Sequence, residues 1–295
     1  MSRHRTAASP GSFTSVLMYL PSPSSGILKL GPLSLHAYGV CIALGMAAAV
    51  WLAGRRWASR GGDPNAIGRV ATWALPAGII GARIYHVVTD WTSFKGRRMD
   101  VFKIWEGGLG IWGGVALGTV VGLVVARAIG LPMLKILDVA APAIPLAQAI
   151  GRWGNWFNQE LFGRPSTLPW AVEISRSKRP DTYKLFETFH PTFLYEALWN
   201  VLVVALVLVV ERRFGKRLKS GRLFAVYVGA YSAGRLVIEQ MRIDTATRFL
   251  GLRINTFVAG ALLLASVLVL LRGMRPAGTT DESRGDAQTV ANPAQ

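Results

Sequence analysis

The chain has 295 residues, of which 51% are hydrophobic and only 17% are charged. A soluble domain carries about a quarter charged residues, so this composition excludes a disordered chain and a fibrous repeat. The net charge of +17 would suggest a nucleic-acid-binding protein if the chain were soluble. Most basic residues instead occupy short loops beside apolar blocks, which indicates contact with lipid headgroups and no nucleic-acid partner.

Seven apolar blocks are long enough to cross a bilayer, which needs roughly 18 or more apolar residues with almost no charge. We therefore predict an all-α polytopic membrane protein with seven transmembrane helices. The predicted spans are 33–53, 68–89, 109–129, 135–151, 192–210, 222–240 and 254–272.

The blocks divide the chain into three predicted parts. Residues 1–32 are expected to form an external, interfacial segment, residues 33–272 a transmembrane catalytic domain, and residues 273–295 a disordered cytoplasmic tail. The connection 152–191 is unusually long for a tight bundle, and long ordered loops are often functional. We expect it to be an ordered external region.

The basic residues also predict the orientation of the chain. The dense basic runs fall in the loops 54–67, 130–134 and 211–221. Cytoplasmic loops of membrane proteins carry an excess of Lys and Arg. This rule places the N-terminus outside and the C-terminus in the cytoplasm.

Small residues in the third block predict close helix packing. Gly110, Gly114, Gly118 and Gly122 recur every four residues, which lines one helix face with hydrogen atoms. Cys41 is the single cysteine, so no disulfide within the chain is possible. Both features are interpreted as packing.

The sixth block carries charges that are costly in a membrane. Arg235 and Glu239 are four residues apart, so a helix places them on one face, and Arg242 extends the stripe. A mutual salt bridge is one explanation. A charged ligand is the preferred one, because a buried ion pair is a poor way to gain stability.

The fourth block ends in the polar run GRWGNWFNQELFGRP, residues 151–165. Arg152 is suited to hold a phosphate, because its planar guanidinium donates two parallel hydrogen bonds. Asn155 and Glu160 would orient a hydroxyl, a thiol or the arginine itself, and Gly163 would allow close backbone approach. The alternative is a capped loop that rests on the headgroups.

Further polar groups flank these two segments. Each also has a structural explanation. Tyr38 would be an interface anchor, and Arg83 a side chain that reaches the membrane surface. Gly107 and Gly108 would belong to an ordinary Gly-rich turn, and His190 would be a structural histidine at a helix start. The backbone amides of the turn WEGGLGIWGG (105–114) could face a phosphate. These flanking candidates are Tyr38, Arg83, Gly107, Gly108 and His190.

The predicted orientation places all of these groups at the outer ends of six segments. Their convergence predicts a polar cavity open to the outer leaflet. Several arginines in such a cavity imply an anionic ligand, and apolar walls imply that the ligand carries acyl chains.

These motifs resemble those of the prolipoprotein diacylglyceryl transferase family. The spacing Arg-x-x-Asn-x-x-x-x-Glu-x-x-Gly of that family falls on Arg152, Asn155, Glu160 and Gly163. The Tyr-Gly of the first block, the W-x-G-G turn, H-P-x-x-L-Y-E and the late G-R-x-x-x-E match as well. The resemblance covers most of residues 21–272, in order.

The resemblance implies a reaction. Such enzymes, bound in the bacterial inner membrane, transfer the diacylglyceryl group of phosphatidylglycerol to the lipobox cysteine of a prolipoprotein signal peptide. A thioether forms, glycerol phosphate leaves, and neither a metal nor an organic cofactor is used. By the same resemblance, Arg152 and Arg235 would hold the phosphate, and Asn155 and Glu160 would complete their surroundings. Glu239 would position Arg235, Tyr38 would contact the lipid headgroup or the substrate, and Gly163 would be needed for backbone approach.

One position departs from the family pattern. Many members carry histidine where this sequence has Trp112, and an indole cannot accept a proton. We expect the arginines to lower the thiol pKa, with His190 or Glu160 as candidate proton acceptors.

Two other classes remain open. A transporter or flippase for anionic phospholipids would use the same arginines without chemistry. A non-enzymatic membrane scaffold is disfavoured by the buried polar cluster.

Overall fold

The computed structural model describes residues 19–30, 33–104, 107–244 and 246–272. The predicted tail 273–295 and most of the predicted N-terminal segment lie outside these residues. Helices dominate the described chain, as predicted from its composition. Its α-helices are α1 (Ala37–Ala58), α2 (Ala66–Thr89), α3 (Ile111–Ala128), α4 (Met133–Ala140), α5 (Ala143–Asn158), α6 (Thr192–Phe214), α7 (Arg222–Glu239) and α8 (Ile254–Leu271).

Short elements connect the helices. Single 3₁₀ turns are η1 (Trp91–Phe94), η2 (Arg98–Phe102), η4 (Arg176–Lys178), η5 (Asp181–Tyr183) and η6 (Gly215–Arg217). Strands pair antiparallel as β1 (Ile27–Leu30) with β2 (Leu33–His36), β3 (Val172–Glu173) with β4 (Thr188–Phe189), and β5 (Arg248–Phe249) with β6 (Leu252–Arg253).

Each of the seven apolar blocks contains helix. Three helices of the described chain, α1, α6 and α8, are long and apolar enough to cross a membrane. A fourth span results if α4 and α5, bent by 41° relative to each other, are counted as one broken span. The predicted positions of the helices are thus confirmed. The number of seven membrane crossings stays a prediction.

Two boundaries differ from the sequence prediction. Residues 33–36 form a strand paired with 27–30, so the first helix begins at Ala37. The predicted span 135–151 is interrupted between Ala140 and Ala143, where Pro142 lacks the backbone N–H that helix continuation requires. Beyond this break α5 continues to Asn158, which places Arg152 and Asn155 on a helix.

The chain forms two compact units. The first unit consists of residues 1–51, 144–202 and 233–259. The second consists of residues 52–143, 203–232 and 260–295. Five helices contribute residues to both units: α1, α5, α6, α7 and α8.

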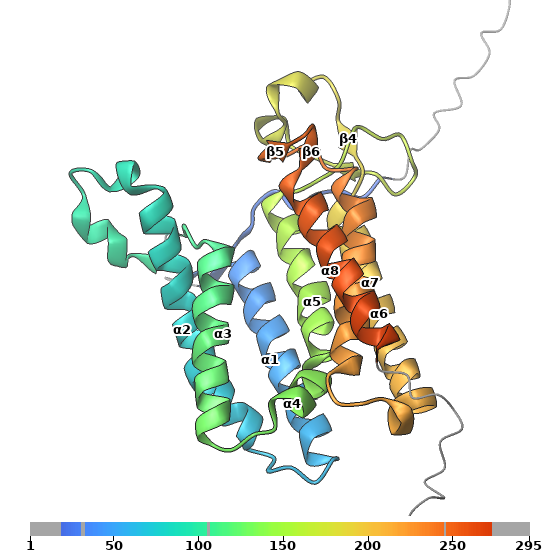
Figure 1. Ribbon diagram of the computed structural model, residues 1–295. Helices are drawn as coiled ribbons and strands as arrows, with labels where there is room; N and C mark the ends of the chain where they lie inside the picture. Colours follow the sequence, from blue (N-terminus) through green and yellow to red (C-terminus); the bar gives the residue numbers. More distant parts are fainter. Residues whose placement is uncertain (1–18, 31–32, 105–106, 245, 273–295) are drawn as a thin grey trace, which may run out of the picture. The chain divides into compact units, whose positions relative to one another are not determined.

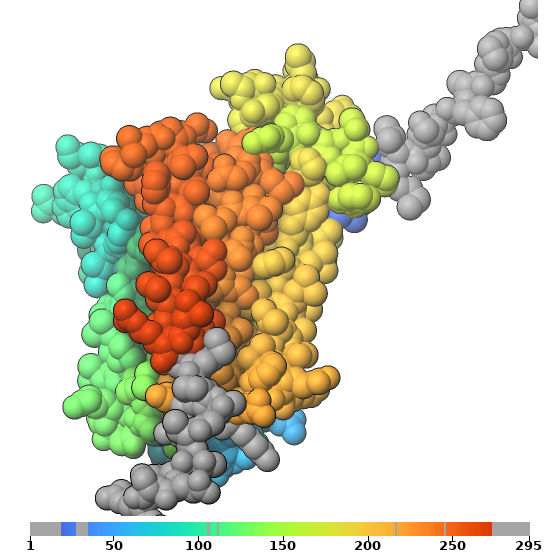
Figure 2. Space-filling model, turned by 45° about the vertical axis from the view of Figure 1, so that its right-hand side comes forward, coloured from blue at the N-terminus to red at the C-terminus, as the bar shows by residue number. Residues whose placement is uncertain are grey.

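In the first unit, small residues and an apolar cluster hold the frame. A Cβ atom at Gly45 of α1 would lie 2.8 Å from the Ala147 carbonyl oxygen of α5, so these two helices pack closely. The segment 159–191, yellow-green in Figure 2, lies over the first turns of α6. Its apolar side chains Phe162, Val172, Ile174 and Phe189 form a buried cluster with Phe193 of α6. The expectation of an ordered 152–191 region agrees with this packing.

In the second unit, α2 and α3 lie side by side (Figure 1). A Cβ atom at Gly114 would lie 3.2 Å from the Gly78 carbonyl oxygen, and one at Gly118 would lie 3.2 Å from the Gly78 Cα. Side chains larger than hydrogen would force the helices apart. The packing role predicted for this glycine stripe is confirmed.

Candidate functional site

The strongest candidate site lies within the first unit, where three helices carry charged side chains to one place. Arg152 and Asn155 come from α5, Glu196 from the second turn of α6, and Arg235 and Glu239 from the end of α7. Glu196 and Glu239 are buried, and Glu239 is 0% exposed. Charges so deeply buried must be paired.

Glu196 joins the two arginines that sequence analysis selected. Arg152 pairs through Nε with Oε2 of Glu196, and Nη1 of Arg235 donates to Oε1 of Glu196 at 2.7 Å. Two guanidinium groups from separate helices therefore meet at one carboxylate. Glu196 lies in the H-P-x-x-L-Y-E segment, and no role was predicted for it. Its negative charge within an apolar block was the available signal.

Glu239 extends the pairing in the direction of the loop after α7. Its Oε2 lies 2.7 Å from Nη2 of Arg235, the i,i+4 contact expected from the sequence. Its Oε1 lies 2.6 Å from Nε of Arg253 and accepts a hydrogen bond from Nδ2 of Asn255 at 3.1 Å. Arg235 is thus held at two of its nitrogens by two carboxylates.

The pairing closes into a ring. Nη2 of Arg253 lies 2.9 Å from Oδ2 of Asp244, and Nε of Arg242 lies 2.7 Å from Oδ1 of the same residue. Nη1 of Arg242 then lies 3.9 Å from Oε1 of Glu196. We call this alternating set of three arginines and three carboxylates the charge ring; its members are Glu196, Arg235, Glu239, Arg253, Asp244 and Arg242.

Asp244 remains ionised in this ring. Burial by itself would raise the pKa of its carboxyl, but the hydrogen bonds and positive charges of Arg242 and Arg253 outweigh burial and lower that pKa. The ring residues Asp244 and Arg253 were not identified from the sequence, because they lie in a loop and at a helix start, where charges are ordinary.

Beside Arg152 lies a set of amide and hydroxyl groups. Nη1 of Arg152 is 3.4 Å from Oδ1 of Asn155, whose Nδ2 donates to Oε1 of Glu160 at 2.9 Å. The Tyr38 hydroxyl lies near Asn155. Its ring packs against Gly154, where a Cβ atom would lie 2.6 Å from Cδ2 of Tyr38. We call Tyr38, Asn155 and Glu160 the polar cradle.

Gly163 lies where a side chain would not fit. Its N–H donates to the His190 carbonyl at 2.9 Å, and it forms a bridge with Arg242. A Cβ atom here would lie 2.9 Å from the His190 Cβ and 3.0 Å from the Met241 carbonyl oxygen. The close backbone approach expected at Gly163 is therefore observed, and it places the loop beside Arg242 of the charge ring.

His190 is engaged with two aromatic side chains. Its Nδ1 lies 3.1 Å from the Tyr195 hydroxyl, which also accepts a hydrogen bond from Nε1 of Trp170 at 3.0 Å. Burial, and the nearby charge of Arg164, lower the pKa of His190. The imidazole is therefore neutral at neutral pH, and its contacts tie the long loop to α6. Its role as a proton acceptor stays a prediction.

Arg83, Gly107 and Gly108 belong to the second unit. The Arg83 guanidinium donates to the carbonyl oxygens of Val101 and Gly107, both at 2.7 Å, and of Gly108 at 3.1 Å. It also donates to the Asp100 carbonyl. A buried guanidinium spread over four backbone carbonyls holds a turn in place, which favours the structural interpretation of Arg83. Phosphate binding by these three residues stays a prediction.

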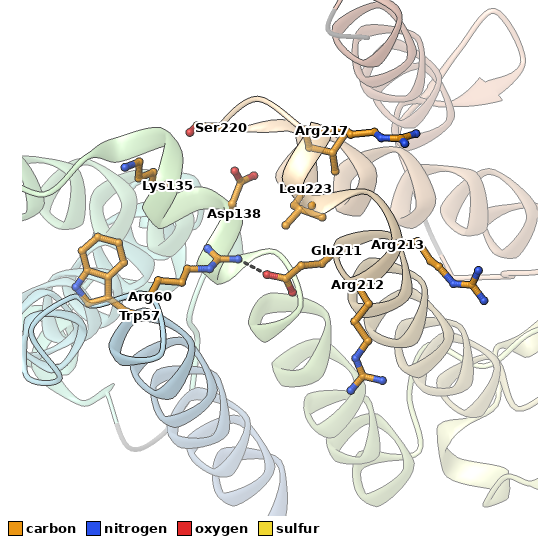
Figure 3. Close-up of a pocket in the computed structure, with 12 residues that line it drawn as sticks. Trp57, Arg60, Lys135, Asp138, Glu211, Arg212, Arg213, Arg217, Ser220 and Leu223 are labelled. Atoms are coloured by element: carbon orange, nitrogen blue, oxygen red, sulfur yellow. Dashed lines mark hydrogen bonds and ion pairs between the residues drawn. The ribbon is translucent and has the colours of Figure 1, made fainter. Parts of the chain in front are cut away.

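A larger cavity of about 900 Å³ also lies in the second unit, and Figure 3 shows its lining. Glu211 is paired with Arg56 at 2.8 Å and with Arg60, and the Asp138 carboxylate accepts the Gly221 and Phe224 N–H groups at the start of α7. In Figure 3 the side chains of Arg212, Arg213 and Arg217 point away from this centre. These contacts make the lining of this cavity a charge cluster at helix ends.

Comparisons with known proteins cover most of the chain. The family model described as prolipoprotein diacylglyceryl transferase matches residues 25–272. The chain belongs to this family.

Individual relatives carry the name of the same enzyme and match most of the chain. A Streptomyces coelicolor protein named phosphatidylglycerol–prolipoprotein diacylglyceryl transferase 2 is 52% identical over 86% of this chain and 81% of its own. Proteins named phosphatidylglycerol–prolipoprotein diacylglyceryl transferase from Frankia alni and Mycobacteroides abscessus are 50% and 45% identical. They cover 88% and 90% of this chain and 69% and 81% of their own. Together with the apolar helices, this family membership indicates a membrane-bound transferase of lipoprotein biosynthesis.

Proposed function

We propose that this protein transfers the diacylglyceryl group of phosphatidylglycerol to the lipobox cysteine of a prolipoprotein, the first step of bacterial lipoprotein maturation. The observation that carries the proposal is the meeting of Arg152 and Arg235 at Glu196. Two guanidinium groups that can share one carboxylate can also share one phosphate, since both anions accept the same forked hydrogen bonds.

The remaining donors of the two arginines are available for the lipid phosphate. Arg152 uses Nε and Nη1 in its contacts, and Arg235 uses Nη1 and Nη2. Each guanidinium has five N–H donors, so both retain hydrogen atoms for an anion. Glu196 and Glu239 then position the arginines, and the polar cradle orients the headgroup or the thiol.

The proposed reaction is an in-line displacement at the glycerol carbon that carries the phosphate. The cysteine thiolate donates an electron pair to this carbon and forms the thioether. The carbon–oxygen bond breaks, and its electrons leave on the phosphate oxygen of glycerol phosphate. Arg152 and Arg235 stabilise the charge that develops on this oxygen. Holding both substrates in one site supplies proximity.

The thiol must first lose its proton. Trp112 offers no base in the Gly-rich turn. A free thiol has a pKa of about 8.5, which nearby arginines lower. Because His190 is held by Tyr195, Glu160 of the polar cradle is the better placed proton acceptor.

We further propose that the chain crosses the bacterial cytoplasmic membrane seven times, with the N-terminus outside and the site toward the outer leaflet. The basic loops at 54–67, 130–134 and 211–221 support this orientation. An external site fits a substrate that is a secreted preprotein.

The direct test incubates the purified protein with labelled phosphatidylglycerol and a lipobox peptide. The expected result is a mass increase of one diacylglyceryl group on the peptide cysteine. Movement of labelled lipid between leaflets with no change in peptide mass would instead identify a flippase and contradict the proposal. A peptide with serine in place of the cysteine serves as the control.

A further inference from the structure

A second cavity, of about 290 Å³, is lined in part by Glu239 within the first unit. Its volume suits a headgroup-sized molecule and is too small for acyl chains. Its charged lining consists of four arginines and two carboxylates: Arg164, Arg242, Arg248, Arg253, Glu239 and Asp244.

The β5–β6 hairpin, at the start of α8 in Figure 1, brings two of these arginines together. Arg248 is the cross-strand partner of Arg253, so both side chains leave the same face of the hairpin. The turn between them is Leu250–Gly251, with φ of 49° and 79°. Two successive positive φ values are the geometry of the tight hairpin turn, which fixes this register.

The lining carries an excess of positive charge. Both carboxylates are already occupied, Glu239 by Arg235 and Arg253, and Asp244 by Arg242 and Arg253. Arg164 donates to the Gln240 carbonyl at 2.7 Å. Among the described residues, neither Arg164 nor Arg248 pairs with a carboxylate. Four arginines against two carboxylates leave two positive charges at the cavity.

The proposed reaction changes the charge of its phosphate. The diester phosphate of phosphatidylglycerol carries one negative charge. The departing monoester carries close to two at neutral pH, because its second pKa is about 6. Glu239 lines this cavity and also pairs with Arg235, so a single carboxylate lies between the cavity and one of the arginines that would hold the lipid phosphate.

We infer that this cavity is a product subsite that binds the phosphate monoester released by the reaction, with Arg248 and Arg164 as its ligands. The inference rests on the proposed function. It explains why two arginines outside the charge ring face the same cavity as buried Glu239, and it gives the leaving group a place that favours the dianion over the lipid diester.

The test titrates glycerol phosphate into the purified full-length protein in a neutral detergent at about pH 7.5, where the monoester is a dianion. Glycerophosphoglycerol, the deacylated headgroup and a monoanionic diester, is titrated in parallel. We expect glycerol phosphate to bind about tenfold more tightly than the diester. Arg248→Gln should weaken its binding about tenfold through loss of one charge-assisted hydrogen bond.

The matched control is Arg176→Gln, which removes an equal charge from an exposed position of the long loop. Its affinity should stay within about twofold of the wild type. Equal affinities for monoester and diester, or an Arg248→Gln variant that binds glycerol phosphate as well as the wild type, would overturn the inference.

Lipidation assays on the same preparations separate this inference from the proposed function. Added glycerol phosphate should inhibit lipidation, and Arg248→Gln should raise the half-inhibitory concentration about tenfold. Lipidation without inhibition or binding would refute the subsite and leave the function standing. Binding that depends on Arg248, in a protein that does not lipidate, would refute the function and leave the anion site.

Discussion

Buried arginines occupy two different environments in this molecule. In the second unit, Arg83 donates to four backbone carbonyl oxygens, and these contacts hold one turn in place. In the first unit, Arg152 and Arg235 meet at a carboxylate and retain free donors beside the polar cradle. An arginine surrounded by carbonyls has no electrostatic reason to receive an anion. Arginines that share a buried carboxylate already form a site whose shape suits an anion.

The largest expected effect is that of Arg152→Ala. It removes one of the two guanidinium groups proposed to stabilise the leaving phosphate, so we expect lipidation of a lipobox peptide to fall by at least about a hundredfold. The Arg152 side chain is partly exposed, so we expect the variant to fold, and its melting temperature checks this. A folded variant that lipidates at the wild-type rate would show that Arg152 does not hold the phosphate.

Arg235→Lys should have the next largest effect. Arg235 contacts Glu196 and Glu239 through different nitrogens, and a lysine ammonium cannot span both and also hold a phosphate in a fork. We expect the rate of lipidation to fall about tenfold to a hundredfold, measured at saturating phosphatidylglycerol. The same exchange at the exposed Arg176 provides the control. Full activity in Arg235→Lys would show that a point charge is sufficient here.

Arg83→Gln tests the other side of the comparison. The substitution leaves backbone carbonyls without their donor, so we expect the free energy of unfolding to fall by about 2 to 4 kcal/mol. Lipidation should fall only in proportion to the loss of folded protein. If instead the affinity for phosphatidylglycerol drops in fully folded material, Arg83 belongs to the lipid site after all.

His190→Gln should have the smallest effect, with lipidation within about threefold of the wild type, because His190 is neutral and held by Tyr195. Its folded-state pKa lies below the ordinary value of 6.5. The unfolded chain therefore takes up a proton first as pH falls below 6.5, and the wild type loses stability there.

The variant should lack this loss of stability. Thermal unfolding between about pH 5 and 7.5 measures the difference. A His190→Gln protein with no lipidation, yet with a normal melting temperature, would restore the histidine as a proton acceptor.

Much of the fold could be predicted because hydropathy fixes where helices form. All seven apolar blocks contain helix, and the glycine stripe of α3 faces α2 as expected. The strand at 33–36 was not predicted, because the four residues LSLH before a helix are too few to show a clear period. The break after α4 was not predicted, because Pro142 lies within an otherwise apolar run.

For the site, polar residues inside apolar blocks were the informative signal. This signal identified Arg152, Asn155, Arg235 and Glu239, which the structure brings into connected contacts. It underrated Glu196, whose importance comes from partners on two other helices. Asp244 and Arg253 could not be found this way, since only the fold of the hairpin shows that loop charges close a ring with buried ones.

The central claim is that guanidinium groups from α5 and α7 hold one lipid phosphate. The most direct test is a structure of the protein with phosphatidylglycerol bound. The account predicts a single phosphate within hydrogen-bonding distance, about 3 Å, of both Arg152 and Arg235. A headgroup that contacts only one of these arginines, or that binds at Arg83 instead, would contradict it.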